Sequence, residues 1–286
     1  MAEQDLAHRV AIVTGGGGGI GRAITLALVE RGARVAVFDV RKESVDSVVK
    51  EATAIGNSES ALAVTRDVTK ADDCEAAIRE TIDAFNSADL LINAHGIGMR
   101  TIREDNWNNP VKFWEIDIDR FHDLMMVNWQ GAFQMARAAA PHMVERGWGR
   151  IINVTTSLDT MLTKGYMPYG PSKAALEAGT SMWAKDLDGT GVTANVVVPG
   201  GPVNTAFIPD NAPFDRAAII QPTIMGPPVC WLATDAANKV NDRRFVARLW
   251  DTSLPGEQAA EAAGAPCGWS AGASGAFRPH KEGGQA

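Results

Sequence analysis

A tyrosine and a lysine one helical turn apart are the strongest candidates for chemistry in this chain. Tyr169 is one of only two tyrosines, and Lys173 follows it four residues later in the stretch YGPSK. Positions i and i+4 share one face of a helix, so the ammonium can lie beside the phenol. Pro168 and Pro171 permit this helix, because both can lie in a first turn where backbone N–H groups lack helical partners. Such a pair suits proton transfer to or from a reacting oxygen.

Three hydroxyl side chains stand in a row shortly before this pair, at the end of a predicted strand. They are Thr155, Thr156 and Ser157. Each can donate a hydrogen bond to a substrate oxygen. Side chains alternate between the two faces of a strand, so Thr156 and Ser157 should point in opposite directions and should not be interchangeable.

Five consecutive glycines after Thr14, in VAIVTGGGGGIGRAI, predict a phosphate-binding loop between a strand and a helix. The bare backbone can approach a pyrophosphate, and the helix N-terminus offers N–H groups and a positive dipole. So many glycines also satisfy GxGxxG by chance, so a tight turn without a ligand is the alternative.

A carboxylate ends the next predicted strand, at Asp39, 18 residues after Gly21. A carboxylate at that place binds the ribose hydroxyls of NAD and repels a 2′-phosphate. We therefore expect NAD rather than NADP, although Arg41 would weaken the preference. The alternative for Asp39 is a helix cap or a solvated loop residue.

Short apolar runs alternate with longer helical patterns along most of the chain. The predicted strands are residues 10–14, 34–40, 61–68, 88–96, 150–157, 193–200 and 243–250. Continuous apolar runs suit strands buried on both faces, and alternation of strand and helix predicts an α/β fold with a doubly wound parallel sheet. We predict one domain over residues 1–251 and a Gly/Ala-rich flexible tail over 252–286.

Composition narrows the class of protein further. The chain has 286 residues, a net charge of −7 and three cysteines. The acidic balance argues against a nucleic-acid partner, and three widely spaced cysteines argue against a disulfide framework or a metal site. We see neither a signal-peptide pattern nor a membrane span, and we expect a cytoplasmic protein.

Five motifs in this order resemble the short-chain dehydrogenase/reductase (SDR) family across residues 8–251. They are TGGGGGIG (14–21), Asp67-Val68, NAHG (93–96), Asn128 within MVNWQG, and YGPSK (169–173). The resemblance implies a Rossmann-type sheet of about seven parallel strands, a nicotinamide cofactor and hydride transfer at a carbonyl carbon. It also implies a homodimer or homotetramer built on the long helices.

The resemblance assigns cofactor contacts residue by residue. Asp67 would meet the adenine amino group and Val68 would flank the ring. The other expected cofactor residues are Thr14, Gly15, Gly19, Ile20, Gly21, Asp39, Asn93, Ala94, Gly96, Lys173, Pro199, Gly200 and Val203. The chain departs from the family pattern at His95, which we interpret as a packing or hydrogen-bonding residue, and in the segment PGGPVNT, where Thr205 matches less well.

The same resemblance implies a proton-transfer site. The family's substrate-binding serine lies about 13 residues before the tyrosine, which reaches Thr156 here, with Ser157 as the alternative. Asn128 would hold a relay water, and Lys173 would bind the cofactor ribose. We expect the lysine ammonium and the nicotinamide charge to lower the pKa of Tyr169, which in a free phenol is about 10.

The sequence thus predicts an NAD-dependent oxidoreductase acting on a secondary alcohol or ketone. The alternatives are a non-catalytic NAD-binding regulator on the same fold and, more remotely, an isomerase or dehydratase. We expect residues 203–228 to form a substrate lid. Candidate pocket residues are Trp107, Trp114, Met161 and Phe207, while Asp159 and Lys164 are solvated loop charges or contacts to a polar substrate group.

Overall fold

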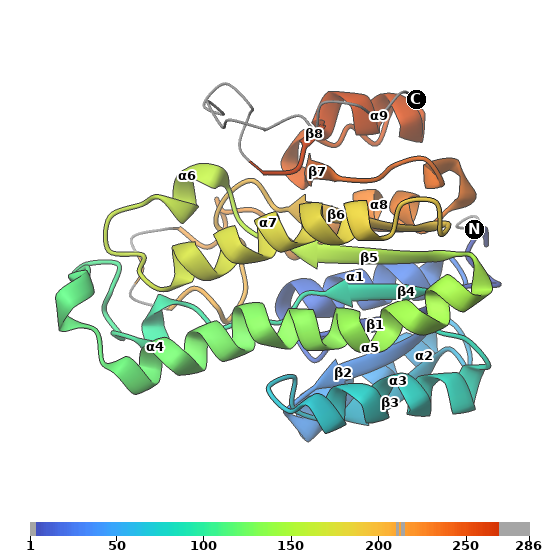
Figure 1. The fold of residues 1–286 in the computed structure, drawn as a ribbon, viewed down its shortest axis with the longest axis horizontal. Coiled ribbons are helices and arrows are strands. Elements are labelled where there is room, and N and C mark those ends of the chain that lie inside the picture. Colours follow the sequence, from blue (N-terminus) through green and yellow to red (C-terminus); the bar gives the residue numbers. More distant parts are fainter. Residues whose placement is uncertain (1–3, 210–211, 213–214, 269–286) are drawn as a thin grey trace, which may run out of the picture.

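The fold is organised around one mostly parallel β-sheet (Figure 1). The computed structural model describes residues 4–209, 212 and 215–268. Within these residues the sheet has eight strands in the order β3-β2-β1-β4-β5-β6-β7-β8. The strands are β1 (Val10–Thr14), β2 (Arg34–Asp39), β3 (Ala61–Thr65), β4 (Leu90–Asn93), β5 (Gly149–Val154), β6 (Val192–Val198), β7 (Arg243–Val246) and β8 (Gly264–Pro266). The strand order reverses between β1 and β4, where doubly wound sheets bind ligands at the carboxyl ends of the strands.

Helices connect the strands on both faces of the sheet. The α-helices are α1 (Gly19–Glu30), α2 (Lys42–Ile55), α3 (Ala71–Phe85), α4 (Ile118–Met125), α5 (Gly131–Arg146), α6 (Leu158–Met161), α7 (Tyr169–Asp186), α8 (Gly226–Leu232) and α9 (Gly256–Ala263). A π-helical turn, η3 (Met126–Gln130), joins α4 to α5. The 3-10 turns are η1 (Met99–Thr101), η2 (Phe113–Glu115), η4 (Pro222–Met225), η5 (Asp235–Ala237) and η6 (Ala247–Leu249). None of the described helices combines the length and the apolar character needed to cross a bilayer.

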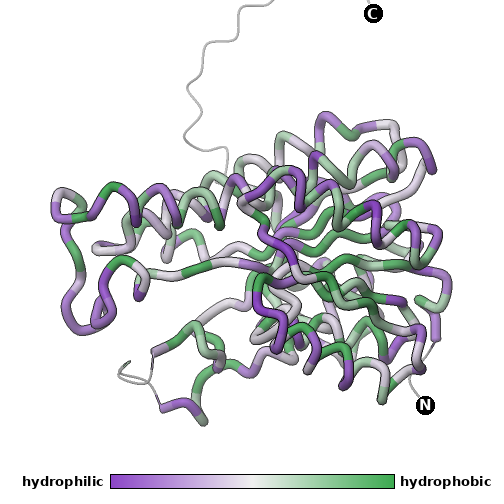
Figure 2. The backbone as a smooth tube through the Cα atoms, turned by 90° about the horizontal axis from the view of Figure 1, so that it is seen from below, coloured by the Kyte–Doolittle hydropathy of each residue, from purple (hydrophilic) through white to green (hydrophobic). Residues whose placement is uncertain are grey.

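Two apolar cores cover the two faces of the sheet. One packs α1, α2 and α8 against the strands through residues such as Ile24 and Val229. The other packs α3, α5 and α7, with Met135 fully buried at its centre. In Figure 1, α5 and α7 run in front of the sheet, and Figure 2 shows hydrophobic stretches of the tube gathered in the strands between the helices. All residues of β1 and β6 are buried, as expected for central strands of a parallel sheet covered on both faces.

The chain after residue 251 corrects the prediction of a flexible tail. The segment contains α9 and then β8, which pairs antiparallel with β7 and adds an eighth strand to the seven parallel ones expected. Alanines of α9, including Ala259 and Ala263, are buried. A helix that buries only alanines gives a weak periodic signal in a Gly/Ala-rich sequence, which is why the pattern was not recognised. The remainder of the predicted tail, 269–286, lies outside the described residues.

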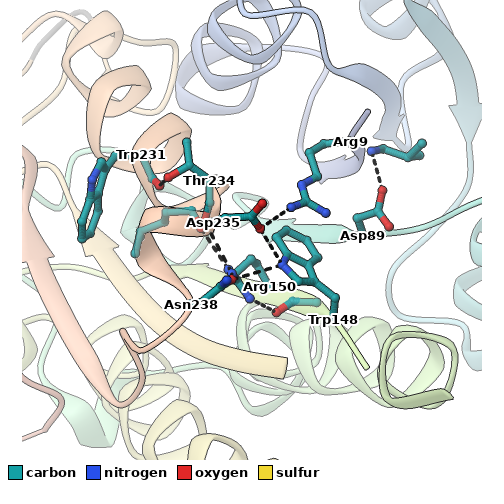
Figure 3. Close-up of polar contacts among 11 residues, drawn as sticks. Arg9, Asp89, Trp148, Arg150, Trp231, Thr234, Asp235 and Asn238 are labelled. Atoms are coloured by element: carbon teal, nitrogen blue, oxygen red, sulfur yellow. Dashed lines mark hydrogen bonds and ion pairs between the residues drawn. The ribbon is translucent and has the colours of Figure 1, made fainter. Parts of the chain in front are cut away.

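The amino end of the sheet is held by a cluster of charged and aromatic side chains (Figure 3). The ring of Trp148 has the guanidinium of Arg9 3.4 Å from its centroid and that of Arg150 4.0 Å from it. Asp235 accepts hydrogen bonds from Arg9 and from Trp148 Nε1. Arg150, only 1 % exposed, donates to Asn238 and to backbone carbonyls. Burial, followed by the charge of Arg9, lowers the pKa of Arg150 to about 10.

Candidate active site

The glycine loop after β1 is a tight turn packed against the end of β4. Gly15 has a φ of +66°, and a Cβ there would lie 2.7 Å from the Cα of His95. A Cβ on Gly21 would lie 2.2 Å from the carbonyl oxygen of Gly15. Real Cβ atoms do not approach backbone so closely, so the turn excludes side chains at both positions.

The loop leads into the N-terminus of α1 with its N–H groups available to a ligand. Gly18 is the N-cap residue, and among the described residues no side chain caps this helix end. Such an end carries orphan N–H donors and a positive dipole, which suit a pyrophosphate. Thr205 lies on the other side of the loop, with its Cβ 3.3 Å from the position of a Cβ on Gly19, while Ile20 packs on the adjoining core. The residues present therefore fit a dinucleotide.

Asp39 and Arg41 meet at the same corner of the glycine loop. A Cβ on Gly17 would lie 3.0 Å from Oδ2 of Asp39. The Nε atom of Arg41 lies 3.6 Å from Oδ1 of Asp39, and Nη2 of Arg41 lies 3.6 Å from the position of a Cβ on Gly18. An acidic and a basic group thus share the corner where we expect an adenosine ribose.

His95 links the end of β1 to the π-helical turn η3 by hydrogen bonds. The hydroxyl of Thr14 and Nδ1 of His95 are 2.6 Å apart, and Nε2 of His95 lies 3.0 Å from the carbonyl oxygen of Val127. An imidazole protonated at Nε2 satisfies both contacts, because it donates to the carbonyl and accepts from the hydroxyl. Burial, followed by the charge of Lys173, lowers the pKa of His95 to about 3, so the ring is neutral. The interpretation of His95 as a hydrogen-bonding residue is confirmed.

Buried amides fix the ends of β4 and β5 beneath the site. Nδ2 of Asn93 donates to Oδ1 of Asn153 over 2.9 Å, and Nδ2 of Asn153 donates to the hydroxyl of Thr180 over 2.8 Å. The N–H of Ala94 donates to the carbonyl of Thr14. These bonds join neighbouring strands and α7 into a rigid floor.

The three hydroxyls after β5 separate into three different environments. Thr155 donates to Oε2 of Glu177 over 2.8 Å. Ser157 is the N-cap of α6, where its Oγ accepts from the N–H of Thr160. The side chain of Thr156 lies beside the hydroxyl of Tyr169 and lowers its pKa. The different orientations of Thr156 and Ser157 are as predicted, and the hydroxyl that meets the tyrosine is that of Thr156.

Tyr169 and Lys173 begin α7, and both have pKa values displaced by burial. Burial raises the pKa of Tyr169 to about 12, against the hydrogen bond from Thr156, which lowers it. Burial lowers the pKa of Lys173 to about 8, and its Nζ donates to the carbonyl of Val154 over 3.0 Å. In the protein without its cofactor, desolvation of the phenolate outweighs the nearby donor, and a lower tyrosine pKa beside Lys173 and a bound nicotinamide stays a prediction.

Asn128 lies in the π-helical turn η3 and is fully buried. Its side chain binds Ile97 twice, accepting from the N–H over 2.8 Å and donating to the carbonyl over 2.9 Å. A Cβ on Gly96 would lie 3.2 Å from Oδ1 of Asn128 and 3.4 Å from Nζ of Lys173. The side chains of Asn128 and Lys173 thus both approach Gly96, where a larger residue would crowd them.

The other predicted cofactor residues surround the same edge of the sheet. After β3, the carboxylate of Asp67 accepts from the N–H and hydroxyl of Thr69, and the carbonyl of Val68 accepts from Gln134. After β6, Gly200 has a φ of +93° and Val203 bridges to Ile220. The carbonyl of Pro199, beside Gly200, accepts from the N–H of Arg248.

Apolar and aromatic side chains line the far side of Tyr169. The ring of Phe207 lies 5.8 Å from that of Tyr169, and the ring of Tyr166 lies 6.2 Å from it on centroid distances. Trp107 meets Tyr166 edge-on. A small apolar cluster packs behind the two tyrosines and consists of Met99, Ile102, Val111 and Leu124. We call Phe207, Tyr166 and this cluster the wall beside Tyr169.

Two predictions for the substrate side are corrected. Trp114 is 68 % exposed and contacts Phe113 and Lys112, so the structure gives it no place in this wall. Residues 222–228 do not form part of a lid, because η4 and α8 pack against α1. Met161 is buried beneath the start of α7, and Asp159 and Lys164 are exposed.

Sequence reasoning missed a buried ion pair directly behind Thr155 and Thr156. Glu177 on α7 is fully buried and accepts from Nε of Arg244 on β7 over 3.0 Å. Arg244 also donates to the carbonyl of Thr156 over 2.7 Å. The partners are 67 residues apart, so no local spacing joins them. A glutamate at a position that helical periodicity places toward the sheet was the available signal.

The fold and the site define an α/β protein of Rossmann-type topology with a dinucleotide loop and a hydroxyl, phenol and ammonium group at one sheet edge. A family model described as short chain dehydrogenase matches residues 9–213, and the chain belongs to this family.

Several known proteins are similar to this chain. An NADPH-dependent aldehyde reductase of Arabidopsis thaliana is 37 % identical over 210 residues, covering 70 % of this chain and 74 % of the relative. A 2,5-dichloro-2,5-cyclohexadiene-1,4-diol dehydrogenase of Sphingobium indicum is 31 % identical, covering 82 % and 92 %. The crystal structure of a dehydrogenase/reductase from Sinorhizobium meliloti has a TM-score of 0.72 at 32 % identity, covering 84 % of this chain and 93 % of its own.

Proposed function

We propose that this chain is an NAD(H)-dependent oxidoreductase that interconverts a secondary alcohol and a ketone. The observation that carries the proposal is the position of the Thr156 side chain beside the Tyr169 hydroxyl at the edge of the sheet, with Lys173 one helical turn further along α7. A regulator that only binds a dinucleotide needs no such pair of hydroxyls facing a substrate wall.

The chain's own residues perform the proton transfer. In the reduction direction, Thr156 and Tyr169 both donate hydrogen bonds to the substrate oxygen, and Tyr169 delivers its proton to the developing alkoxide. In the oxidation direction, Tyr169 acts as the phenolate and accepts the proton of the alcohol. A bound nicotinamide supplies the hydride donor or acceptor. Lys173 replaces the lost proton, since its pKa of about 8 places it near neutrality. Asn128 would hold a relay water within reach of Lys173, since both side chains approach Gly96.

The glycine loop and Asp39 support NAD as the cofactor. The carboxylate of Asp39 lies where it can accept from ribose hydroxyls and would repel a 2′-phosphate. Arg41 is the one basic group that we place at this corner, and its contact with Asp39 leaves it partly neutralised. One relative is named as NADPH-dependent, so the cofactor must be tested directly.

The wall of Phe207, Tyr166 and the apolar cluster supports a substrate with an apolar portion next to its reacting carbon. Exposed apolar side chains on the long helices, including Phe133 and Met182, support a homodimer or homotetramer. The three free cysteines support a reducing compartment such as the cytoplasm.

The decisive experiment compares Tyr169→Phe with Tyr166→Phe. Alcohols and ketones with apolar substituents are screened by absorbance of the reduced nicotinamide, and the best substrate is used for both variants. Loss of the reacting hydroxyl in Tyr169→Phe lowers kcat about 10³-fold, with NAD affinity unchanged by fluorescence titration. Tyr166→Phe keeps kcat within about tenfold, since it removes a hydroxyl from the wall only. Equal turnover in Tyr169→Phe and wild type contradicts the proposal.

The cofactor is tested by measuring kcat/KM with NAD and NADP in parallel. Asp39→Asn removes the charge that repels a 2′-phosphate, so the preference for NAD should fall by at least about tenfold. A wild-type enzyme that prefers NADP would overturn the NAD assignment and leave the oxidoreductase assignment intact.

A further inference from the structure

A buried carboxylate and guanidinium lie behind the proposed substrate hydroxyl, outside the proton-transfer site itself. Glu177 is 0 % exposed, and the side chain of Arg244 is 8 % exposed. Burying two charges costs several kcal/mol of desolvation per ion, and a well-packed apolar pair of similar volume is often as stable. The pair is therefore better explained by what it holds in place than by its contribution to stability.

The bonds of this pair converge on the two residues that follow β5. Glu177 accepts from the Thr155 hydroxyl over 2.8 Å through Oε2 and from Nε of Arg244 over 3.0 Å through Oε1. Arg244 then donates through Nη2 to the carbonyl oxygen of Thr156 over 2.7 Å. The chain between these two anchors can hardly rotate without breaking a buried bond.

The C-terminal segment completes this arrangement. Oε1 of Glu177 also accepts from the backbone N–H of Gly268 over 3.2 Å. Pairing of β8 with β7 places Ala265 opposite Arg244 and so brings Gly268 to the carboxylate. Helix α7, which begins with Tyr169, carries Glu177 eight residues later, so one rigid helix bears both the phenol and the anchor for the neighbouring hydroxyl.

We propose that Glu177 and Arg244 are positioning residues that hold the Thr156 hydroxyl at Tyr169, and that the strand β8 locks them in place. The inference rests on the proposed function, because it assumes that Thr156 binds the substrate oxygen. Catalytic groups must be held within about 0.5 Å of their productive geometry, and displacement of about 1 Å costs roughly 10²-fold in rate.

The test is a double-mutant cycle between Arg244→Met and Thr156→Val, with kcat, KM and NAD affinity measured for each chain. We expect Arg244→Met to lower kcat about tenfold or more with NAD affinity unchanged, because only the hydroxyl is released. Thr156→Val should then cost far less in the Arg244→Met chain than in wild type, because the hydroxyl is already misplaced. Additive effects of the two changes would overturn the proposal.

Two further variants distinguish a positioning role of Arg244 from a loss of stability. Arg244→Lys retains the charge at Glu177 but cannot reach both the carboxylate and the Thr156 carbonyl, so its kcat should lie between those of wild type and Arg244→Met. Arg244→Lys also replaces Arg244→Met in the double-mutant cycle if Arg244→Met does not fold. Arg150→Met is the matched control, because it removes a buried guanidinium at the opposite end of the sheet. Its kcat should equal that of wild type despite lower thermal stability.

The outcomes separate this inference from the proposed function. If Tyr169→Phe is inactive while the kcat of Arg244→Met and Arg244→Lys equals that of wild type, the positioning role is wrong and the oxidoreductase assignment stands. If Arg244→Met and Arg150→Met lose kcat equally, the loss comes from destabilisation and the positioning role is also wrong. If Tyr169→Phe retains full turnover, the proposed function is wrong, and the positioning role that rests on it falls with it.

Discussion

The two ends of the sheet both hold buried charges and aromatic rings, but they use them differently. At the amino end, Arg9 and Arg150 lie on opposite sides of the Trp148 ring, and their N–H groups meet Asp235, Asn238 and carbonyls (Figure 3). Most of the polar groups there bind one another. The cluster therefore offers few free hydrogen-bonding groups to a ligand.

At the carboxyl end, the polar groups are held from behind and face outward. Lys173 is anchored by Val154, Asn128 by Ile97, and Thr156 by Arg244. On their other side, Lys173 and Asn128 both lie close to Gly96, and Thr156 lies beside the hydroxyl of Tyr169. The comparison indicates that the amino end serves stability, while the carboxyl end holds the buried polar groups of the proposed active site.

The largest expected effect tests the amino end. Arg150→Met removes the donor to Leu232, Gly149 and Asn238 while it keeps much of the side-chain volume. Buried acceptors left without a donor should lower the free energy of unfolding by about 3 kcal/mol. Urea unfolding measures this loss, and turnover of the folded enzyme should be unchanged. A large drop in kcat would show that loss of stability by itself lowers turnover.

The next largest effect is on turnover and distinguishes the adjacent hydroxyls of Thr156 and Ser157 at the carboxyl end. Thr156→Val keeps the shape but removes the hydroxyl at Tyr169, so kcat/KM should fall about 10²-fold, as for one donor to a developing oxyanion. Ser157→Ala removes the cap of α6 and should cost about 1 kcal/mol of stability. Steady-state kinetics and urea unfolding of both variants settle the comparison. A larger kinetic loss in Ser157→Ala would show that the roles are exchanged.

The smallest expected effect is on the pH dependence of stability and concerns His95, which links the end of β1 to η3. The pKa of His95 is about 3 in the fold and 6.5 in the unfolded chain. The unfolded chain therefore binds more protons below pH 6.5, so stability is lost as pH falls through this range. Between pH 7 and 5 the imidazole should account for about 1–2 kcal/mol of that loss.

His95→Gln isolates this contribution, because an amide can donate to Val127 and accept from Thr14 without titrating. Urea unfolding at pH 7 and pH 5 should show a smaller acid loss in the variant than in wild type. The same loss in both proteins would assign the acid sensitivity to other groups.

The predicted and the missed parts of the site differ in the range of their interactions. The i,i+4 spacing of Tyr169 and Lys173 is local, so the sequence alone placed the pair correctly on one helix, α7. The predicted strand over 150–157 is too long, because β5 ends at Val154 and Ser157 caps α6. The pairing of Glu177 with Arg244 depends on how β7 joins β6. Spacing along the chain carries no information about that contact.

Burial is the second quantity that sequence alone could not supply. The prediction for the tyrosine pKa considered Lys173 and a bound nicotinamide and left out burial, which raises the pKa of Tyr169 to about 12 in the protein without cofactor. The strand β8 was missed for a related reason, since a three-residue strand is defined by its partner β7 and not by a periodic pattern of its own.

The π-helical turn Met126–Gln130 has a consequence for how the long helix is phased. One additional residue in a helical turn rotates everything beyond it by about 100° relative to a continuous α-helix. Asn128 can therefore face Ile97 while Met135 faces the sheet core, although an uninterrupted helix would fix these two directions together. Deleting one residue from this turn would force a choice between the buried core and the asparagine contact.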